Sequence, residues 1–165
     1  MANKAYLLLG SNEGDRVGWL QQCIAMLGSQ HGKILQTSAV YETAAWGKED
    51  QPDFLNMAVC IETILTPAEL LQGIQHIEKE LGRQREVKWG QRTLDIDILF
   101  FNDTVIRQPD LIVPHPFMQE RRFALAPLNE IAPRLLHPVF GKTIQQLLEE
   151  CPDPLEVKVA YNNLE

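Results

Sequence analysis

The chain has 165 residues, of which 45% are hydrophobic and 22% charged, as in one globular domain spanning residues 1–165. Its net charge of −7 argues against general attraction to nucleic acid or to an anionic membrane. Because no apolar run is long enough for a membrane span or a signal sequence, and the three cysteines lack metal-site spacing, we expect a cytoplasmic protein with reduced thiols that pack as small apolar groups.

A strand, a turn and a helix open the chain. Residues 5–9 are an apolar run that predicts a buried strand, and residues 10–15 are rich in turn-forming residues and end in a helix cap, Asp15. Apolar residues recur at helical spacing over residues 17–27, and we expect Gly28 to stop this helix. The turn lacks the patterns of a P-loop and of a dinucleotide-binding loop, which favours a tight turn with a cap over a phosphate site.

Two further strands are expected in the next segment. Residues 33–43 alternate and contain β-branched side chains, which predicts one strand. A polar loop over residues 44–53 leads to a strand over residues 55–64, whose apolar side chains fall on one face. Asn56 is unusual inside this apolar strand and would need a partner if it is buried.

A second helix and a fourth strand complete the predicted core. Thr66 and Glu69 form the pattern of a capping box, and Gly82 ends the helix. The strand after the next loop makes the order β-α-β-β-α-β, which predicts an α+β, ferredoxin-like fold with an antiparallel sheet. The C-terminal extension should contain short strands and helices, with helical pieces near residues 123–131 and 143–150. We assign no role to residues 151–165.

Two acidic residues on the fourth strand are the strongest candidates for a site. Asp95 and Asp97 should point to one face, about 7 Å apart at their Cα atoms, while Leu94, Ile96 and Ile98 point to the other. Aspartate is depleted in strands, and this strand is otherwise very apolar. A solvated strand face is the plain alternative, but paired carboxylates favour a hard divalent cation such as Mg²⁺.

Basic residues cluster directly before this acidic pair. Residues 83–92 contain Arg83, Arg85, Lys88 and Arg92 but one acid, Glu86, so their local charge is +3. Such a cluster suits phosphate oxygens, although an ordinary solvated loop has the same composition. Paired acids next to clustered basic residues therefore suggest a site for Mg²⁺ and a polyphosphate. We expect the basic loop to close over this ligand.

Two weaker candidates, a histidine and an aromatic slot, lie elsewhere in the chain. His115 is held between two prolines, and its best functional interpretation is a donor to phosphate rather than a zinc ligand. Phe54 and Phe123 would form an aromatic slot in which Asn56 reads the edge of a heterocycle, although both rings are more often core residues.

Several separated motifs resemble one known family. The run Arg92-Thr93-Leu94-Asp95-Ile96-Asp97-Ile98-Leu99, preceded by Trp89-Gly90, closely resembles the signature of the 6-hydroxymethyl-7,8-dihydropterin pyrophosphokinases. Further matches are Gly10-Ser11-Asn12, Gln51-Pro52-Asp53-Phe54-Leu55-Asn56, Gly82-Arg83, Pro114-His115-Pro116, Arg121 with Phe123, Pro127-Leu128 and Glu130-Ile131-Ala132-Pro133. The resemblance implies a cytoplasmic, ferredoxin-like monomer that uses Mg²⁺ to transfer pyrophosphate from ATP to the pterin hydroxymethyl group. AMP leaves, and the pterin diphosphate serves folate synthesis.

The resemblance also implies roles for individual residues. The catalytic residues would be Arg83, Arg92, Asp95 and Asp97, with the two aspartates holding two Mg²⁺ ions. The ATP-binding residues would be Leu71, Gln75, Arg83, Arg85, Trp89, Arg92, Ile98, Ile112, His115 and Arg121. The pterin-binding residues would be Thr43, Ala44, Trp46, Phe54, Asn56, Asp95 and Phe123. Glu78 would orient side chains of the basic loop.

Two other classes of protein remain open at this point. An RNA-recognition domain has the same order of elements, but the chain is acidic and lacks that family's basic and aromatic strand motif. A metal-dependent nucleotide phosphohydrolase would use the same aspartates with water in place of the pterin hydroxyl group. ATP turnover without pterin separates the hydrolase from the transferase.

Overall fold

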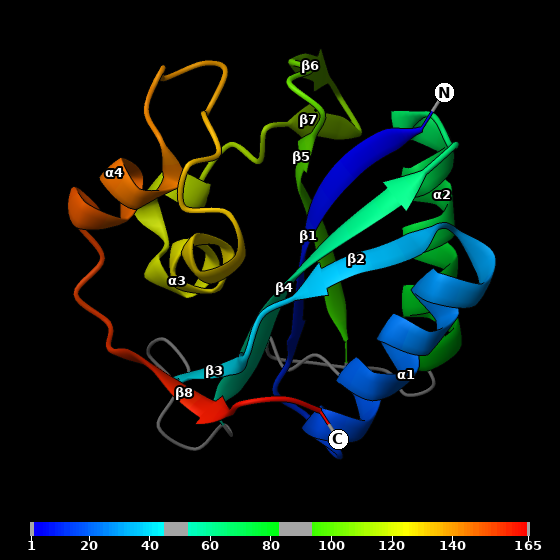
Figure 1. Ribbon diagram of the computed structural model, residues 1–165. Helices are drawn as coiled ribbons and strands as arrows, with labels where there is room; N and C mark the ends of the chain where they lie inside the picture. Colours follow the sequence, from blue (N-terminus) through cyan, green and yellow to red (C-terminus); the bar gives the residue numbers. More distant parts are fainter. Residues whose placement is uncertain (1, 45–52, 83–93, 165) are drawn as a thin grey trace.

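Residues 2–44, 53–82 and 94–164 are described by the computed structural model (Figure 1). Six strands form an antiparallel sheet in the order β5-β1-β4-β3-β8, with β2 also paired to β4. The strands are β1 (Asn3–Ser11), β2 (Lys33–Thr37), β3 (Val40–Thr43), β4 (Phe54–Thr63), β5 (Asp95–Phe101) and β8 (Val157–Tyr161). The order of β5, β1, β4 and β2 with β3 is that of a ferredoxin-like core, which confirms the predicted fold.

Helices cover both faces of this sheet. Figure 1 shows α1 (Arg16–Gln30) and α2 (Pro67–Ile77) on one side, and α3 (Arg122–Ile131) and α4 (Ile144–Glu149) on the other. The strands alternate accordingly: Leu55, Met57, Val59 and Ile61 of β4 pack in the cluster with α1 and α2, as predicted. Ala58 packs in the second cluster, with α3 and α4. The sheet therefore separates two cores.

Local hydrogen bonds explain where the first two helices begin. The Asp15 carboxylate accepts from the backbone N–H of Gly18 at 3.0 Å, which confirms the predicted cap. The Thr66 hydroxyl accepts from Glu69 N at 3.2 Å, and the Glu69 carboxylate accepts from Thr66 N at 2.9 Å, which completes the predicted capping box. A π-helical turn, η1 (Glu78–Gly82), extends α2 to the predicted end at Gly82.

Two sequence predictions need correction. Helix α1 continues past Gly28 to Gln30, because a glycine inside a helix costs only about 1 kcal/mol and the following turn still forms its hydrogen bonds. The strand expected over residues 33–43 is broken between β2 and β3, where the buried Ser38 hydroxyl accepts from Ala58 N at 2.9 Å. The C-terminal segment, to which the sequence assigned no role, contributes β8 at the edge of the sheet.

Smaller elements complete the C-terminal extension, as expected. Strands β6 (Ile106–Gln108) and β7 (Leu111–Val113) form a hairpin, and a 3₁₀ turn, η2 (Met118–Glu120), precedes α3. Cys23 and Cys60 are buried, as predicted for small apolar groups, and burial raises the pKa of the Cys23 thiol to about 12.

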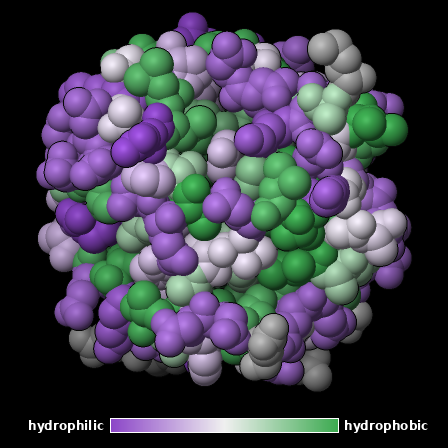
Figure 2. Space-filling view, in the orientation of Figure 1, coloured by the Kyte–Doolittle hydropathy of each residue, from purple (hydrophilic) through white to green (hydrophobic). Residues whose placement is uncertain are grey.

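The face of the molecule seen in Figure 2 is mostly polar. Figure 2 shows polar side chains over most of the visible face, with smaller apolar groups between them. Within the described ranges, no helix has the length and apolarity needed to cross a membrane.

Candidate active site

The two aspartates of β5 share one face of the strand, as predicted. Ile96 and Ile98 are each only 6% exposed on the opposite face, whereas Asp95 and Asp97 are partly exposed and line a cavity. In the sheet, Asp95 is paired with Gly10 and Asp97 with Leu8 of β1. The alternation of an ordinary strand therefore places both carboxylates on the wall of one cavity.

The cavity has a volume of about 560 Å³, which is within the range of small-molecule sites. It lies between the sheet, the start of α3 and the segment that leads into β8. Its lining residues are Leu8, Gly10, Thr43, Ala44, Phe54, Asn56, Asp95, Asp97, Glu120, Arg121, Phe123, Pro152, Asp153, Pro154 and Leu155. The described members of the predicted pterin site and the two predicted metal ligands thus meet in one place.

Three paired residues on neighbouring strands form one part of the cavity wall. Gly10 of β1 pairs with Asn56 of β4 on one side and with Asp95 of β5 on the other. Asn56 is 5% exposed and Thr43 is 4% exposed, so two polar side chains are buried at this end of the cavity. The Thr43 hydroxyl has no hydrogen-bond partner among the described residues.

The start of α3 contributes Arg121 and Phe123. The guanidinium carbon of Arg121 lies 5.8 Å from the centre of the Phe123 ring and 5.5 Å from that of Phe117. Cation–π contacts at these distances hold the arginine over aromatic faces. The cavity therefore has an aromatic wall with a positive group beside it.

The charge of the described lining is strongly negative. Four carboxylates (Asp95, Asp97, Glu120 and Asp153) and one cation (Arg121) give a formal sum of −4 + 1 = −3. Carboxylates that share a cavity repel one another unless a cation lies between them. This charge favours a divalent cation here, with oxygen ligands from Asp95 and Asp97.

His115 does not line this cavity but a second, smaller one beside β6 and β7, and it is within the electrostatic reach of Arg121 and Asp95. Burial, and secondarily the Arg121 charge, lower the pKa of His115 to about 4, so the imidazole is neutral near pH 7. Its Nδ1 accepts from Phe117 N at 3.2 Å, and its own backbone N–H donates to Leu99 O at 3.1 Å. The proton of the neutral ring therefore belongs on Nε2, which is a hydrogen-bond donor.

Glu78 holds the strand that carries the two aspartates, while the basic-loop side chains that it was expected to orient lie outside the described residues. Its carboxylate accepts from the backbone N–H of Ile96 at 2.9 Å. This bond fixes β5 between Asp95 and Asp97, so Glu78 positions the strand that carries both aspartates.

Several other predicted residues do not line this cavity. Leu71 and Gln75 are on α2, Ile98 packs with the helices on the opposite face of the sheet, and Ile112 is 45% exposed on β7. Their contact with adenine stays a prediction. The predicted residues Trp46, Arg83, Arg85, Lys88, Trp89 and Arg92 lie outside the described residues.

Sequence reasoning missed part of the lining. Gly10 was interpreted as turn chemistry, Glu120 was passed over, and residues 152–155 were given no role, yet all of them line the cavity. The β-branched and aromatic residues Val157, Val159 and Tyr161 at every second position were a signal for β8. No local pattern connects residues 152–155 to a site near β1 and β5.

Comparison with known proteins shows the family to which the chain is similar. The family model described as "7,8-dihydro-6-hydroxymethylpterin-pyrophosphokinase (HPPK)" matches residues 6–133. The chain is 57% identical over 133 residues to the 2-amino-4-hydroxy-6-hydroxymethyldihydropteridine pyrophosphokinase of Bacillus subtilis (strain 168), covering 79% of each chain. It is 46% identical over 145 residues to the protein of the same name from Aquifex aeolicus (strain VF5), covering 88% of this chain and 90% of that one.

A solved structure supports the fold. The wild-type HPPK-DHPS protein of Plasmodium falciparum superposes with a TM-score of 0.72 at 20% sequence identity. The match covers 91% of this chain but only 45% of that longer one, and the likeness concerns the fold alone.

Proposed function

Since the chain belongs to the 7,8-dihydro-6-hydroxymethylpterin-pyrophosphokinase family, we propose that its cavity transfers pyrophosphate from ATP to the hydroxymethyl group of 6-hydroxymethyl-7,8-dihydropterin. As a member of this family the chain is a diphosphotransferase of folate synthesis. In the proposed reaction AMP leaves and the pterin diphosphate is formed. The observation that carries the proposal is the placing of Asp95 and Asp97 in the same cavity as Phe54, Asn56 and Phe123.

The pterin is proposed to lie at the end of the cavity formed by β3, β4 and α3. Phe54 and Phe123 supply faces for a flat heterocycle, and stacking on an aromatic side chain contributes about 1–3 kcal/mol per ring. Asn56 is proposed to supply hydrogen bonds at the ring edge, with Thr43 beside it on β3. Ala44 lines the same end, and Trp46 is proposed to complete it.

Asp95 and Asp97 are the proposed ligands of two Mg²⁺ ions. Their carboxylates are the hard oxygen ligands that Mg²⁺ prefers, they share one face of β5, and together with the other described lining residues they give the cavity a formal charge of −3, which favours a cation. When bound, Mg²⁺ would neutralise phosphate charge and draw the polyphosphate toward the aspartates.

Basic groups are proposed to hold the polyphosphate of ATP. Arg121 lines the cavity, and the neutral His115 carries its donor proton on Nε2. Arg83 and Arg92 are proposed to add two further cations as catalytic residues, with Arg85 and Trp89 in the loop that closes. Leu71, Gln75, Ile98 and Ile112 are proposed to surround the adenine.

The proposed step is a direct displacement. The hydroxymethyl oxygen of the pterin attacks the β-phosphorus of ATP, a new O–P bond forms, and the bond from that phosphorus to the α–β bridging oxygen breaks. AMP leaves with the bridging oxygen. The hydroxyl proton passes to a carboxylate, for which Asp97 is our hypothesis, and then to solvent. The protein's contribution is alignment and charge neutralisation, because an alcohol nucleophile needs no covalent intermediate.

The test is ³¹P NMR of the protein with ATP, Mg²⁺ and 6-hydroxymethyl-7,8-dihydropterin, beside a sample without pterin. AMP together with a pterin diphosphate, formed only when pterin is present, is the expected result. Formation of ADP, or release of phosphate without pterin, would overturn the proposal in favour of a kinase or a phosphohydrolase on the same aspartates.

A further inference from the structure

The segment that leads into β8 forms one wall of the proposed pterin cavity. Pro152, Asp153, Pro154 and Leu155 all line the cavity, opposite the sheet residues that carry the proposed chemistry. The segment then enters β8, where Val157 pairs with Thr43 of β3. Thr43 is itself a lining residue, so this wall is continuous with the sheet.

A reciprocal set of hydrogen bonds holds this wall to the start of α3. The Asp153 carboxylate accepts from Arg122 N at 3.0 Å and from Leu155 N at 2.9 Å. In return, the Arg122 guanidinium donates through Nε to Asp153 O at 3.2 Å and through Nη2 to Cys151 O at 3.1 Å. Each residue thus satisfies polar groups of the other's backbone.

These bonds also cap α3 from a distant part of the chain. Arg121 is the N-cap residue of α3 and makes no capping hydrogen bond with its side chain. The first backbone N–H groups of a helix have no partner within the helix, and an acidic group near them is stabilising. Asp153, 31 residues further along the chain, supplies that acceptor to the N–H of Arg122.

We propose that Asp153 is a positioning residue that joins the wall formed by residues 152–155 to the start of α3 and thereby sets the width of the pterin cavity. The proposal rests on the proposed function, because it assumes that pterin occupies this cavity. Arg122 lies between Arg121 and Phe123, both of which line the cavity. Releasing Arg122 therefore loosens the aromatic wall and the opposite wall together.

The experiment compares four full-length proteins: the wild type, Asp153→Ala, Asp153→Asn and Glu156→Ala. Glu156 is an exposed acid in the same segment that does not line the cavity, which makes Glu156→Ala the matched control. We expect Asp153→Ala to raise the KM for pterin about 10-fold while kcat changes less than about 3-fold. The two walls that contact the pterin ring become looser, but Asp95 and Asp97 stay in place. Asp153→Asn keeps one carbonyl oxygen as an acceptor, so its KM should be intermediate.

A double-mutant cycle tests whether Asp153 and Arg122 act as one clamp. Arg122→Met keeps the apolar stem but removes both guanidinium bonds, and it should raise the KM for pterin by a similar factor. The two substitutions remove different bonds, so if the bonds hold the wall only as a set, the double variant should bind pterin no more weakly than the worse single variant. Independent, multiplying effects would overturn the proposed clamp.

The remaining outcomes separate this proposal from the proposed function. A wild type without pyrophosphate transfer would contradict the proposed function. An active wild type whose KM for pterin is unchanged in Asp153→Ala would overturn the positioning role alone, even if the melting temperature falls. If Asp153→Ala does not fold, Asp153→Asn decides: a KM raised about 3-fold or more supports the clamp, and a wild-type KM overturns it.

Discussion

The Oδ1 atom of Asn56 occupies the space in which a side chain on Gly10 would stand. A Cβ built on Gly10 would lie 2.7 Å from this oxygen, closer than real Cβ contacts allow. Gly10 is also the sheet neighbour of Asp95, so the glycine lies between the proposed pterin-reading amide and the proposed metal ligand. The absence of a side chain on β1 therefore lets the Asn56 amide reach the cavity.

Gly10→Ala should weaken pterin binding at least about 10-fold, because the new methyl group displaces the Asn56 amide and its hydrogen bond to the ring. Fluorescence titration with the dihydropterin measures this change. Gly28→Ala is the matched control: a Cβ there meets its nearest atom, Ile34 Cγ1, at an ordinary 3.5 Å, and alanine favours the helix. Unchanged pterin affinity in Gly10→Ala would contradict the assigned role of Asn56.

Phe123→Leu should raise the KM for pterin about 10-fold, since leucine keeps the apolar volume but has no flat face for stacking. Steady-state kinetics at saturating ATP measures the effect, and kcat should change much less. Phe140→Leu, on an exposed aromatic side chain outside the cavity, is the control. Equal KM values for the two variants would exclude Phe123 from the pterin site.

His115 should make the protein less stable in acid. Its pKa is about 4 in the folded protein against an ordinary value of 6.5, so between these pH values the unfolded chain binds more protons. Stability is therefore lost as the pH falls from 6.5 towards 4, and above 6.5 this contribution vanishes. The loss should be about 1–2 kcal/mol, below the full value of the shift because the ring is partly exposed.

Urea unfolding of the wild type and of His115→Asn at pH 7.0 and 4.5 measures this loss. Asparagine keeps a side-chain acceptor for Phe117 N but does not titrate. The other histidines with lowered pKa values, His31 and His137, are present in both proteins, so their effects cancel in the difference. An equal loss of stability in the two proteins would show that His115 is not the group responsible.

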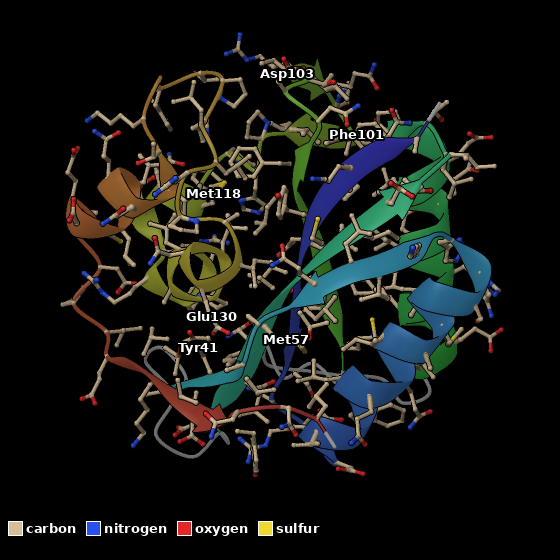
Figure 3. All side chains as sticks on the ribbon, viewed as in Figure 1. Tyr41, Met57, Phe101, Asp103, Met118 and Glu130 are labelled. Atoms are coloured by element: carbon tan, nitrogen blue, oxygen red, sulfur yellow. The ribbon has the colours of Figure 1, made fainter. Side chains whose placement is uncertain are left out.

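Tyr41→Phe should lower the free energy of unfolding by about 1–2 kcal/mol without lowering kcat. The Tyr41 hydroxyl donates to Glu130 Oε1 at 2.6 Å and so joins β3 to α3, as Figure 3 shows for these two side chains. Burial and this bond raise the pKa of Tyr41. Tyr161→Phe, on an exposed ring of β8, is the control. Equal free energies of unfolding for the two variants would show that the Tyr41–Glu130 hydrogen bond does not stabilise the fold.

Features that depend on near neighbours in the chain were predictable. The common face of Asp95 and Asp97 follows from the period of a strand, and the caps at Asp15 and Thr66 follow from the chemistry of three or four consecutive residues. The resemblance to a family added Phe54, Asn56 and Phe123, which do line the cavity.

Features that depend on contacts between distant residues were not predictable. The break at Ser38 depends on Ala58 across the sheet, and the wall at residues 152–155 depends on the bonds between Asp153 and Arg122. The glycine at position 10 matters through Asn56, 46 residues away, rather than through its own turn. Such relationships carry no local pattern, so they emerge only from the folded structure.

The central claim is that the aspartates of β5 carry the pyrophosphate transfer, and the most direct measurement is the rate of AMP formation by Asp97→Asn. With saturating ATP, Mg²⁺ and pterin, we expect kcat to fall at least about 100-fold while the circular dichroism spectrum stays that of the wild type. Asp103→Asn, in the exposed turn after β5, should keep the wild-type rate. Turnover by Asp97→Asn within a few-fold of the wild type would contradict the claim.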